Sequence, residues 1–259
     1  MTTTANAKRE MEVSLPIGYL DDEGRQHKSV VLRKMTGKEE AILADRRFQK
    51  NGAKLVTELL HSCLVRVGDL PKNGASTIEK MYSADRNFLL LKLRILTFGA
   101  ELEAHYTCPS CGESMQITED LTDLPIRGLD NGESPDEVPV ALEDGYVDKD
   151  GSVHTALTLR LPTGIDETAV APQMRQNASL GKNALLSRCM KSLGDLPAHR
   201  VEALGPKIMT ELTMSDRRLI DRALNQSAPG VDLIRELTCS HCGGGFKATL
   251  DMTHFLSAG

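Results

Sequence analysis

The sequence has very few aromatic side chains. Only 3% of its 259 residues are Phe, Trp or Tyr, and Trp is absent. Proteins that hold single-stranded nucleic acids stack the bases on aromatic faces. The composition therefore argues against a base-stacking platform, and equally against an aromatic sugar-binding surface.

Long apolar runs are also missing. No segment approaches the roughly 18 consecutive apolar residues typical of a membrane-spanning helix, and Met1–Glu10 lacks the hydrophobic core of a signal peptide. Apolar residues make up 40% and charged residues 26%, which is ordinary for one or two globular domains. We therefore expect a cytoplasmic protein without a membrane span and with a flexible leader at residues 1–10.

The sequence has fewer basic than acidic residues. The formal net charge is −5, and the chain has no basic tract. Because nucleic-acid affinity comes largely from cations that neutralise phosphates, we expect that nucleic acid is not the partner.

Familiar catalytic motifs are absent as well. The chain has no Gly-x-Ser-x-Gly elbow, no Walker loop, no His-Glu-x-x-His and no dinucleotide glycine fingerprint. His27 and His154 fall in predicted hairpins and are expected to be half-exposed strand residues. We predict a protein that is not an enzyme, with neither catalytic nor cofactor-binding residues.

What the chain does contain is a pair of Cys-x-x-Cys motifs. Cys108–Cys111 and Cys239–Cys242 are each followed by Gly, and the chain has six cysteines in all. Disulfides are rare in the cytosol, so these cysteines are expected to be thiols or metal thiolates.

The two motifs lie at matching places in a sequence that repeats itself. When the sequence is aligned with itself at an offset of 127 residues, residues 18–37 match residues 145–164 without a gap. After one deletion and a short insertion, the match continues to the second Cys-x-x-Cys motif. The matching positions are Gly18 and Gly145, Tyr19 and Tyr146, Asp21 and Asp148, Gly24 and Gly151, His27 and His154, Leu32 and Leu159, Arg33 and Arg160, Thr36 and Thr163, Cys63 and Cys189, Gly68 and Gly194, Asp85 and Asp216, Arg86 and Arg217, and Cys108 and Cys239.

The repeat defines the expected domain organisation. Residues 11–124 form a first module, 125–137 an acidic linker with Pro and Gly, and 138–259 a second module that is an internal repeat of the first. The period exceeds that of solenoid repeats. The predicted fold class is α+β, in which each duplicated module holds a β-hairpin, helices and a strand–Cys knuckle–strand, and a structural zinc site joins the halves.

Local patterns place the helices of the first module. Thr36 and Glu39 can form a capping box that starts a helix. Apolar residues from Leu55 to Val67 recur at helical spacing and predict a helix that runs up to Gly68. A second helix is expected over 83–96, with Ser83 as its cap. Asp85 and Arg86 then lie in its first turn, where the helix dipole favours an acid, and we interpret them as structural.

The two Cys-x-x-Cys motifs together provide the ligands of one tetrahedral zinc site. Structural zinc is bound by four thiolate or imidazole ligands. We predict that Cys108, Cys111, Cys239 and Cys242 hold a single structural Zn²⁺ that clamps the modules together. Alternatively, each knuckle takes its other ligands from another subunit or from a nearby histidine, the candidates being His105, His241 and His254. A thiol redox site is disfavoured because Gly and a strand, instead of a helix, follow the first motif.

Five short motifs over residues 30–125 occur in an order that resembles a known family. They are Leu32–Glu40, Ser62–Leu64, Met81–Arg86, Thr97–Gly99 and Cys108–Gly112. Their order resembles that of the baseplate or tail-assembly proteins of contractile-tailed phages and related contractile injection systems, and in the second module the resemblance rests mostly on the internal repeat.

The resemblance implies a non-enzymatic role in building the tail baseplate or hub, with other tail or baseplate proteins as partners. It implies a location in the host cytoplasm during assembly or in the baseplate of the virion tail. It leaves open whether the chain is an assembly factor or a permanent component, and whether it forms a homo- or hetero-oligomer. A zinc-ribbon adaptor for nucleic acid or the transcription machinery is the alternative function, and a thiol redox protein is the third.

Overall fold

The structure is a computed structural model that describes residues 9–48, 50–70, 74–129, 133–225 and 228–250. Most of the expected leader, parts of the linker and the last nine residues lie outside this range. Both halves of the chain contain helices together with antiparallel strands, so the predicted α+β class is confirmed.

The first half of the chain contains nine helices and strands within the described residues. They are β1 (Glu10–Leu20), β2 (Gln26–Arg33), α1 (Gly37–Leu43), α2 (Gly52–Cys63), β3 (Leu64–Val67), α3 (Ala75–Lys80), α4 (Ser83–Phe98), β4 (Glu101–Thr107) and β5 (Ser114–Asp120). A short strand, β6 (Ile126–Arg127), follows them.

The second half presents a similar order. Its elements are β7 (Val138–Val147), β8 (Val153–Leu159), α5 (Gly164–Gln176), α6 (Ala178–Cys189), β9 (Met190–Leu193), α7 (Ala198–Glu211), α8 (Met214–Asn225), β10 (Gly230–Val231), β11 (Ile234–Thr238) and β12 (Gly245–Thr249). Strand β10 pairs with β6, so part of the expected linker is tied to the second half.

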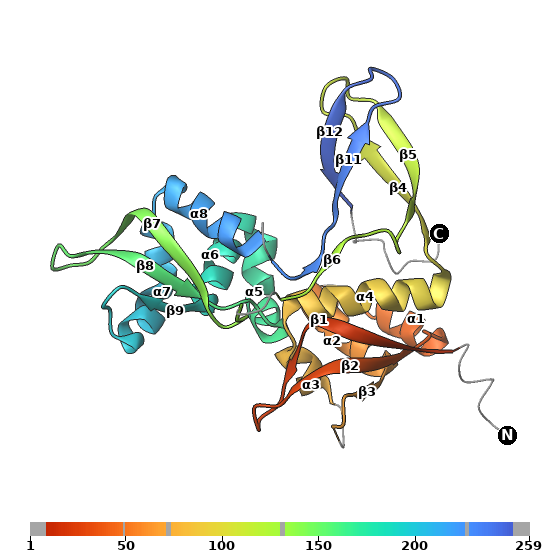
Figure 1. Cartoon of the computed structure of the whole chain (residues 1–259), viewed down its shortest axis with the longest axis horizontal. Coiled ribbons are helices and arrows are strands. Elements are labelled where there is room, and N and C mark those ends of the chain that lie inside the picture. Colours follow the sequence, from red (N-terminus) through yellow and green to blue (C-terminus); the bar gives the residue numbers. More distant parts are fainter. Residues whose placement is uncertain (1–8, 49, 71–73, 130–132, 226–227, 251–259) are drawn as a thin grey trace.

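Each half begins with an antiparallel three-stranded sheet, in the order β1-β2-β3 or β7-β8-β9. In both hairpins the register shifts, between Ser14 and Tyr19 in the first and between Ala141 and Tyr146 in the second. Figure 1 shows α4 lying across the first sheet, while the second sheet lies at the opposite side of the molecule with α7 and α8. The predicted hairpins are thus confirmed.

The helix predicted up to Gly68 ends earlier, at Cys63. Residues 64–67 form β3, in which Leu64 pairs with Leu32 and Val67 with Val30. Apolar residues at this spacing are compatible with one long helix or with a helix followed by a strand. The strand forms because residues 64–67 can pair with the free edge of β2. The prediction was wrong for these four residues because a long-range pairing overrides the local pattern.

Cys63 lies in the main core of the first half. Its side chain is fully buried among residues of the first sheet, α2 and α4. Burial raises the pKa of its thiol to about 12, and the same holds for Cys189 in the second half. Both cysteines therefore behave as small apolar core residues.

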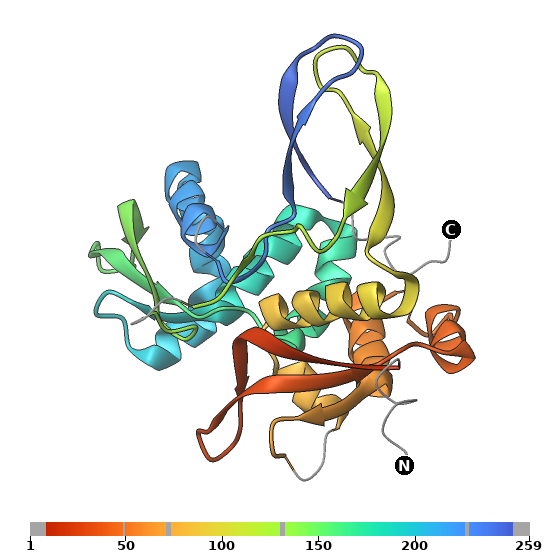
Figure 2. The same ribbon diagram turned by 45° about the vertical axis from the view of Figure 1, so that its right-hand side comes forward.

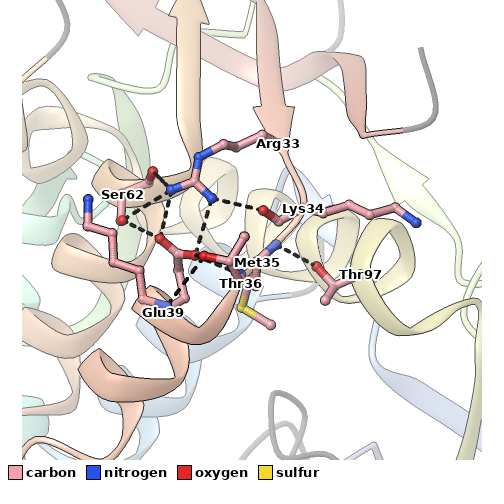
Figure 3. A network of polar contacts seen from close by, with 8 residues as sticks. Arg33, Lys34, Met35, Thr36, Glu39, Ser62 and Thr97 are labelled. Carbon is pink, nitrogen blue, oxygen red and sulfur yellow. Dashed lines mark hydrogen bonds and ion pairs between the residues drawn. The ribbon is translucent and has the colours of Figure 1, made fainter. Parts of the chain in front are cut away.

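The predicted capping box at Thr36 is confirmed and is part of a larger network (Figure 3). The Thr36 amide donates to Glu39 Oε2 over 2.8 Å, and Arg33 Nη2 donates to Glu39 Oε1 over 2.7 Å. Burial opposes ionisation of Glu39, but bonds from Arg33, Ser62 and Thr36 lower its pKa to about 2. This carboxylate therefore joins the end of β2 to the start of α1 and the last turn of α2.

The same arrangement recurs in the second half. Asp166 accepts a bond from the Thr163 amide over 3.0 Å and one from Arg160 Nη1 over 2.6 Å. Arg188 from α6 takes part through a 3.0 Å ion pair. Asp166 has a shorter side chain than Glu39, but it makes the equivalent contacts between the end of β8 and the start of α5.

The cap predicted at Ser83 was wrong. Helix α4 has Tyr82 at its N-cap, and the buried Ser83 hydroxyl has no hydrogen-bond partner among the described residues. The Ser83 amide instead donates to Pro162 O over 2.8 Å, so a contact with the second half sets where this helix begins.

Asp85 has a structural role, as expected. It acts through hydrogen bonds to strand β1 and not only through the dipole of its own helix. Its two carboxylate oxygens accept the amides of Ile17 and Gly18 over 2.9 Å each, in the irregular part of β1 where Gly18 has φ +106°. Irregular pairing leaves such amides without a partner strand. Burial raises the pKa of Asp85 to about 6, whereas the bonds from Ile17 and Gly18 act to lower it.

Asp216 does the same in the second half. It accepts the amides of Glu143, Asp144 and Gly145 over 2.6, 3.3 and 2.9 Å. In each half, an acid in the first turn of a helix therefore satisfies the bulge of the hairpin beside it.

The two hairpin histidines were expected to be half-exposed, and this was wrong. The side chains of His27 and His154 are each only 10% exposed. His27 Nε2 lies 2.9 Å from Asp21 Oδ2, and His154 Nε2 lies 3.2 Å from Asp148 Oδ2. The turn after β3 covers His27 so closely that a Cβ on Gly68 would overlap its ring.

We predict that Asp85→Ala lowers the free energy of unfolding by about 2–6 kcal/mol, because it leaves two buried amides without an acceptor at roughly 1–3 kcal/mol each. Urea unfolding followed by circular dichroism measures the change. The control is Asp123→Ala, at an exposed position, which should change stability by less than about 0.5 kcal/mol. Equal stability of the two variants would contradict the role given to Asp85.

Candidate metal centre

Two hairpins from opposite halves form an arm that stands away from the rest of the molecule (Figures 1 and 2). We use the name arm for residues 101–120 and 234–249. Strands β4 and β5 pair from Glu101 with Asp120 to Thr107 with Ser114, and β11 and β12 pair from Ile234 with Thr249 to Thr238 with Gly245. The strand–knuckle–strand predicted at the end of each half is confirmed.

The turn at the tip of each hairpin has the same backbone. In the first, the Cys108 amide donates to Glu113 O over 2.8 Å, and the Gly112 amide donates to Cys108 O over 2.9 Å. Gly112 has φ +74°, a left-handed conformation that favours glycine. This explains why Gly follows the second cysteine.

The second tip repeats this geometry. The Cys239 amide donates to Gly244 O and the Gly243 amide to Cys239 O, each over 2.9 Å, and φ of Gly243 is +71°. In both tips the backbone bends so that its two thiols face the other hairpin.

The four sulfur atoms meet between the tips. Cys108 Sγ lies 3.8 Å from Cys242 Sγ, Cys111 Sγ lies 3.7 Å from Cys239 Sγ, and all four atoms lie within 4.8 Å of one another. A disulfide needs about 2.05 Å. A tetrahedral ion with metal–sulfur bonds of about 2.3 Å would instead separate the sulfurs by about 3.8 Å. The cluster therefore fits one four-coordinate metal ion.

The environment of the cluster favours a thiolate at Cys108. Cys108 and Cys239 are buried, whereas Cys111 and Cys242 are exposed. The Cys111 and Ser110 amides bond to the Cys108 sulfur and lower its pKa to about 6. The Glu113 amide acts in the same direction on Cys111, but contacts with the other three thiols raise its pKa to about 12. Four sulfurs this close share protons, which a bound metal would displace.

None of the three candidate histidines joins this cluster within the described residues. His105 alternates with the buried Ala104 and Tyr106 and lies on the exposed face of β4, and His241 is exposed within its knuckle. His254 lies outside the described residues. Among those residues, only the four cysteines form a group of at least three metal-binding side chains whose ligand atoms lie this close.

The donor set limits the chemistry of the site. Four cysteine ligands complete a tetrahedron and leave no open position for water or substrate. A catalytic zinc site requires such an open position. The element after Cys111 is strand β5, as predicted, whereas a thiol redox motif would open a helix. The geometry therefore suits a structural metal better than a catalytic or redox centre.

A small core lies between the two hairpins below the sulfurs. Tyr106, Met115 and Phe246 contribute to it, together with the buried cysteines. Glu119 connects the hairpins further, because it accepts a bond from the Tyr106 hydroxyl over 2.9 Å and forms a 2.9 Å ion pair with Arg235.

The two halves also meet away from the arm, at a contact that sequence reasoning missed. Arg86 at the start of α4 is fully buried and forms a 3.2 Å ion pair with Glu167 of α5. Its remaining donors reach Ala53 O, Ile78 O and the Thr57 hydroxyl over 2.9–3.1 Å. The expected zinc clamp is therefore not the only connection between the halves.

Backbone bonds strengthen this second contact. The Gly164 amide donates to Met81 O over 3.1 Å, and Tyr82 forms an isolated antiparallel bridge with Thr163. Arg86 packs directly on Gly164, where any Cβ would overlap the guanidinium group. The periodicity of α4 gave no sign that Arg86 faces the second half.

Comparison with known proteins gives one match. Residues 9–256 match the family model described as T4 bacteriophage base plate protein. No curated protein and no solved structure matches the chain. None of the helices in the described residues is long and apolar enough to cross a membrane.

We predict that Cys108→Ser/Cys239→Ser loosens the arm alone. Hydrogen exchange followed by mass spectrometry should show faster exchange in β4, β5, β11 and β12, while α4 and β1 stay protected because Arg86 and the first core hold them. The matched control is Ser110→Ala/Ser240→Ala, which alters both tips but keeps the thiols. Loss of protection throughout the first half would contradict the independence of the two contacts.

Proposed function

This chain belongs to the T4 bacteriophage base plate protein family, and we propose that it is a non-enzymatic structural or assembly protein of a contractile-tail baseplate or its hub. Membership suggests a structural role, contact with other tail proteins and a place in the virion tail. The observation that carries the proposal is this family match over nearly the whole chain. The closed donor set at the arm is consistent with it.

We further propose that the chain is a duplicated module. The leader comprises residues 1–10, the first module 11–124, the linker 125–137 and the second module 138–259. Matching sheets, matching bulges bound by Asp85 and Asp216, and matching Cys tips support the duplication. The arm then joins the last hairpins of the two copies.

The metal in the arm is proposed to be one structural Zn²⁺ bound by Cys108, Cys111, Cys239 and Cys242. Sulfur spacings of 3.7 and 3.8 Å across the hairpins support a shared site, since neither knuckle alone supplies four ligands. The ion would fix how the two hairpins lie against each other, while Arg86 and Glu167 hold the bodies of the two halves.

The zinc proposal predicts one zinc per chain in the native protein and none in either Cys108→Ser or Cys239→Ser. Either substitution removes one of four ligands from the same ion, so the effects should be equal. Native mass spectrometry counts the metal. Cys63→Ala, which alters a buried cysteine outside the arm, is the control and should keep its zinc. A single-knuckle variant that retains zinc would exclude the shared site.

The partners are proposed to be other tail or baseplate proteins, met in the host cytoplasm during assembly. A zinc-ribbon adaptor for nucleic acid is the alternative, and it would need a basic face, whereas the chain has a net charge of −5. A thiol redox protein is the third possibility, and it would need a dithiol that cycles without metal.

Affinity-tagged protein purified from cells that produce tail components is expected to recover baseplate proteins. The reason is that a baseplate role requires specific protein contacts, whichever surface makes them. Mass spectrometry of the eluate identifies them, and tagged protein expressed without tail genes is the control. Selective recovery of nucleic acid in place of tail proteins would overturn the proposed function.

A further inference from the structure

The two halves differ in the helix that lies beside the tip of the first hairpin. Helix α3 has six residues, whereas α7, at the corresponding place in the second half, has fourteen. A cleft of about 420 Å³ lies between the tip of the β7–β8 hairpin and α7. We call it the hairpin-tip cleft. In Figure 1 the β7–β8 hairpin and α7 lie at the end of the molecule away from the first sheet.

The charges at the two tips also differ. Asp22 in the first hairpin is replaced by Lys149 in the second. In the first half, Lys80 at the end of α3 bonds to Asp22 over 2.7 Å. In the second half, Lys149 and Arg200 line the cleft, and neither forms an ion pair or side-chain hydrogen bond with any residue that the structure describes.

The anions of the cleft already have partners. Asp148 accepts the amides of Asp150 and Ser152 and contacts His154. Glu211 lies 3.6 Å from Lys207 on the same helix. Lys149 and Arg200 thus remain as cationic groups without a counterion among the described residues, and His199 lies beside them in the cleft.

The floor of the cleft is apolar. Tyr146, Leu196 and Leu204 line it, and Val147 at its rim is 56% exposed. Val153, directly opposite Val147 in the hairpin, is also 56% exposed. A free anion would satisfy the cations but leave the exposed side chains of Val147 and Val153 in contact with water, whereas a protein segment with both acidic and apolar side chains would satisfy both.

We propose that the hairpin-tip cleft binds an acidic, amphipathic segment of a partner protein, which places an apolar side chain against Val147 and Leu204 and carboxylates at Lys149 and Arg200. This rests on the proposed function only for the source of the segment, a tail protein. The first half lacks this combination, because its helix is shorter and its tip is acidic. The longer α7 therefore gives the second half a binding face of its own.

Binding is tested with three fluorescein-labelled probes read by fluorescence anisotropy. The first is a 12-residue peptide of Glu and Leu at helical spacing, the second has Lys in place of Glu, and the third is a single-stranded oligonucleotide. The native protein should bind only the first. The double variant Lys149→Asp/Arg200→Glu should weaken that binding at least about tenfold, since two cation contacts are lost.

The matched control is Lys38→Glu/Lys54→Asp, which makes the same change in charge at two exposed sites of the first half. It should bind the acidic peptide within about twofold of the native affinity. Three results would overturn the proposal: no binding of the acidic peptide, equal binding of the Lys peptide or the oligonucleotide, or unchanged affinity in the double variant.

The source of the segment is identified by a photo-crosslinking residue at Ala203, an exposed position that lines the cleft. In cells that produce tail components it should capture an acidic, apolar segment of a tail protein. Capture of a basic segment or of nucleic acid overturns the proposal. If baseplate proteins co-purify but Ala203 captures none of them, the cleft proposal fails while the proposed function stands.

Discussion

The first turn of α4 carries two adjacent buried charges on which both the first half and its contact with the second depend. Asp85 satisfies the amides of the β1 bulge, and Arg86 reaches α2, α3 and the second half at once. Burying a charge costs several kcal/mol unless its hydrogen bonds are completed. Here nearly every donor and acceptor of the two groups is used, so the cost is offset only when hairpin, helices and the second half are all in place.

This dependence explains why the two halves are similar in pattern but not in contacts. Asp216 keeps the role of Asp85, whereas Arg217 bonds to Met209 O within its own half. One arginine thus reaches across to the other half and its counterpart does not. Two identical sets of contacts would need a symmetric arrangement. Here the contacts between the bodies of the halves are asymmetric, which leaves the surfaces of the second half free to differ.

The sequence predicted those features that depend on neighbouring residues. The hairpins, the capping box at Thr36 and the turns after Cys108 and Cys239 follow from local residue types and are found in the structure. The end of α2 at Cys63 could not be predicted, since the free edge of β2 converts the next four residues into a strand. The use of Arg86 escaped prediction for the same reason: its partners are 8 to 81 residues away in the chain.

The candidate metal centre was predictable because of the repeat. Neither knuckle alone identifies a four-ligand site, and a separation of more than 120 residues is unusual for a zinc ribbon. Once two copies of one hairpin are assumed, their tips are equivalent, and the cross-hairpin spacings of 3.7 and 3.8 Å agree with that assumption. What the repeat does not predict is that the cluster lies at the end of an arm, away from the contact made by Arg86.

That separation bears on what the metal can do. An ion at the contact between the bodies would determine whether the halves associate, but Arg86, Glu167 and the backbone bonds beside them already achieve this. An ion at the tip of two short hairpins, with only a small core beneath, instead determines whether the arm has one shape. Because a rigid projection loses less conformational entropy on binding than a loose one, the proposed zinc ion would preorganise a surface for contact with another protein. Such a surface is consistent with the proposed role in a baseplate, which requires contacts with other proteins.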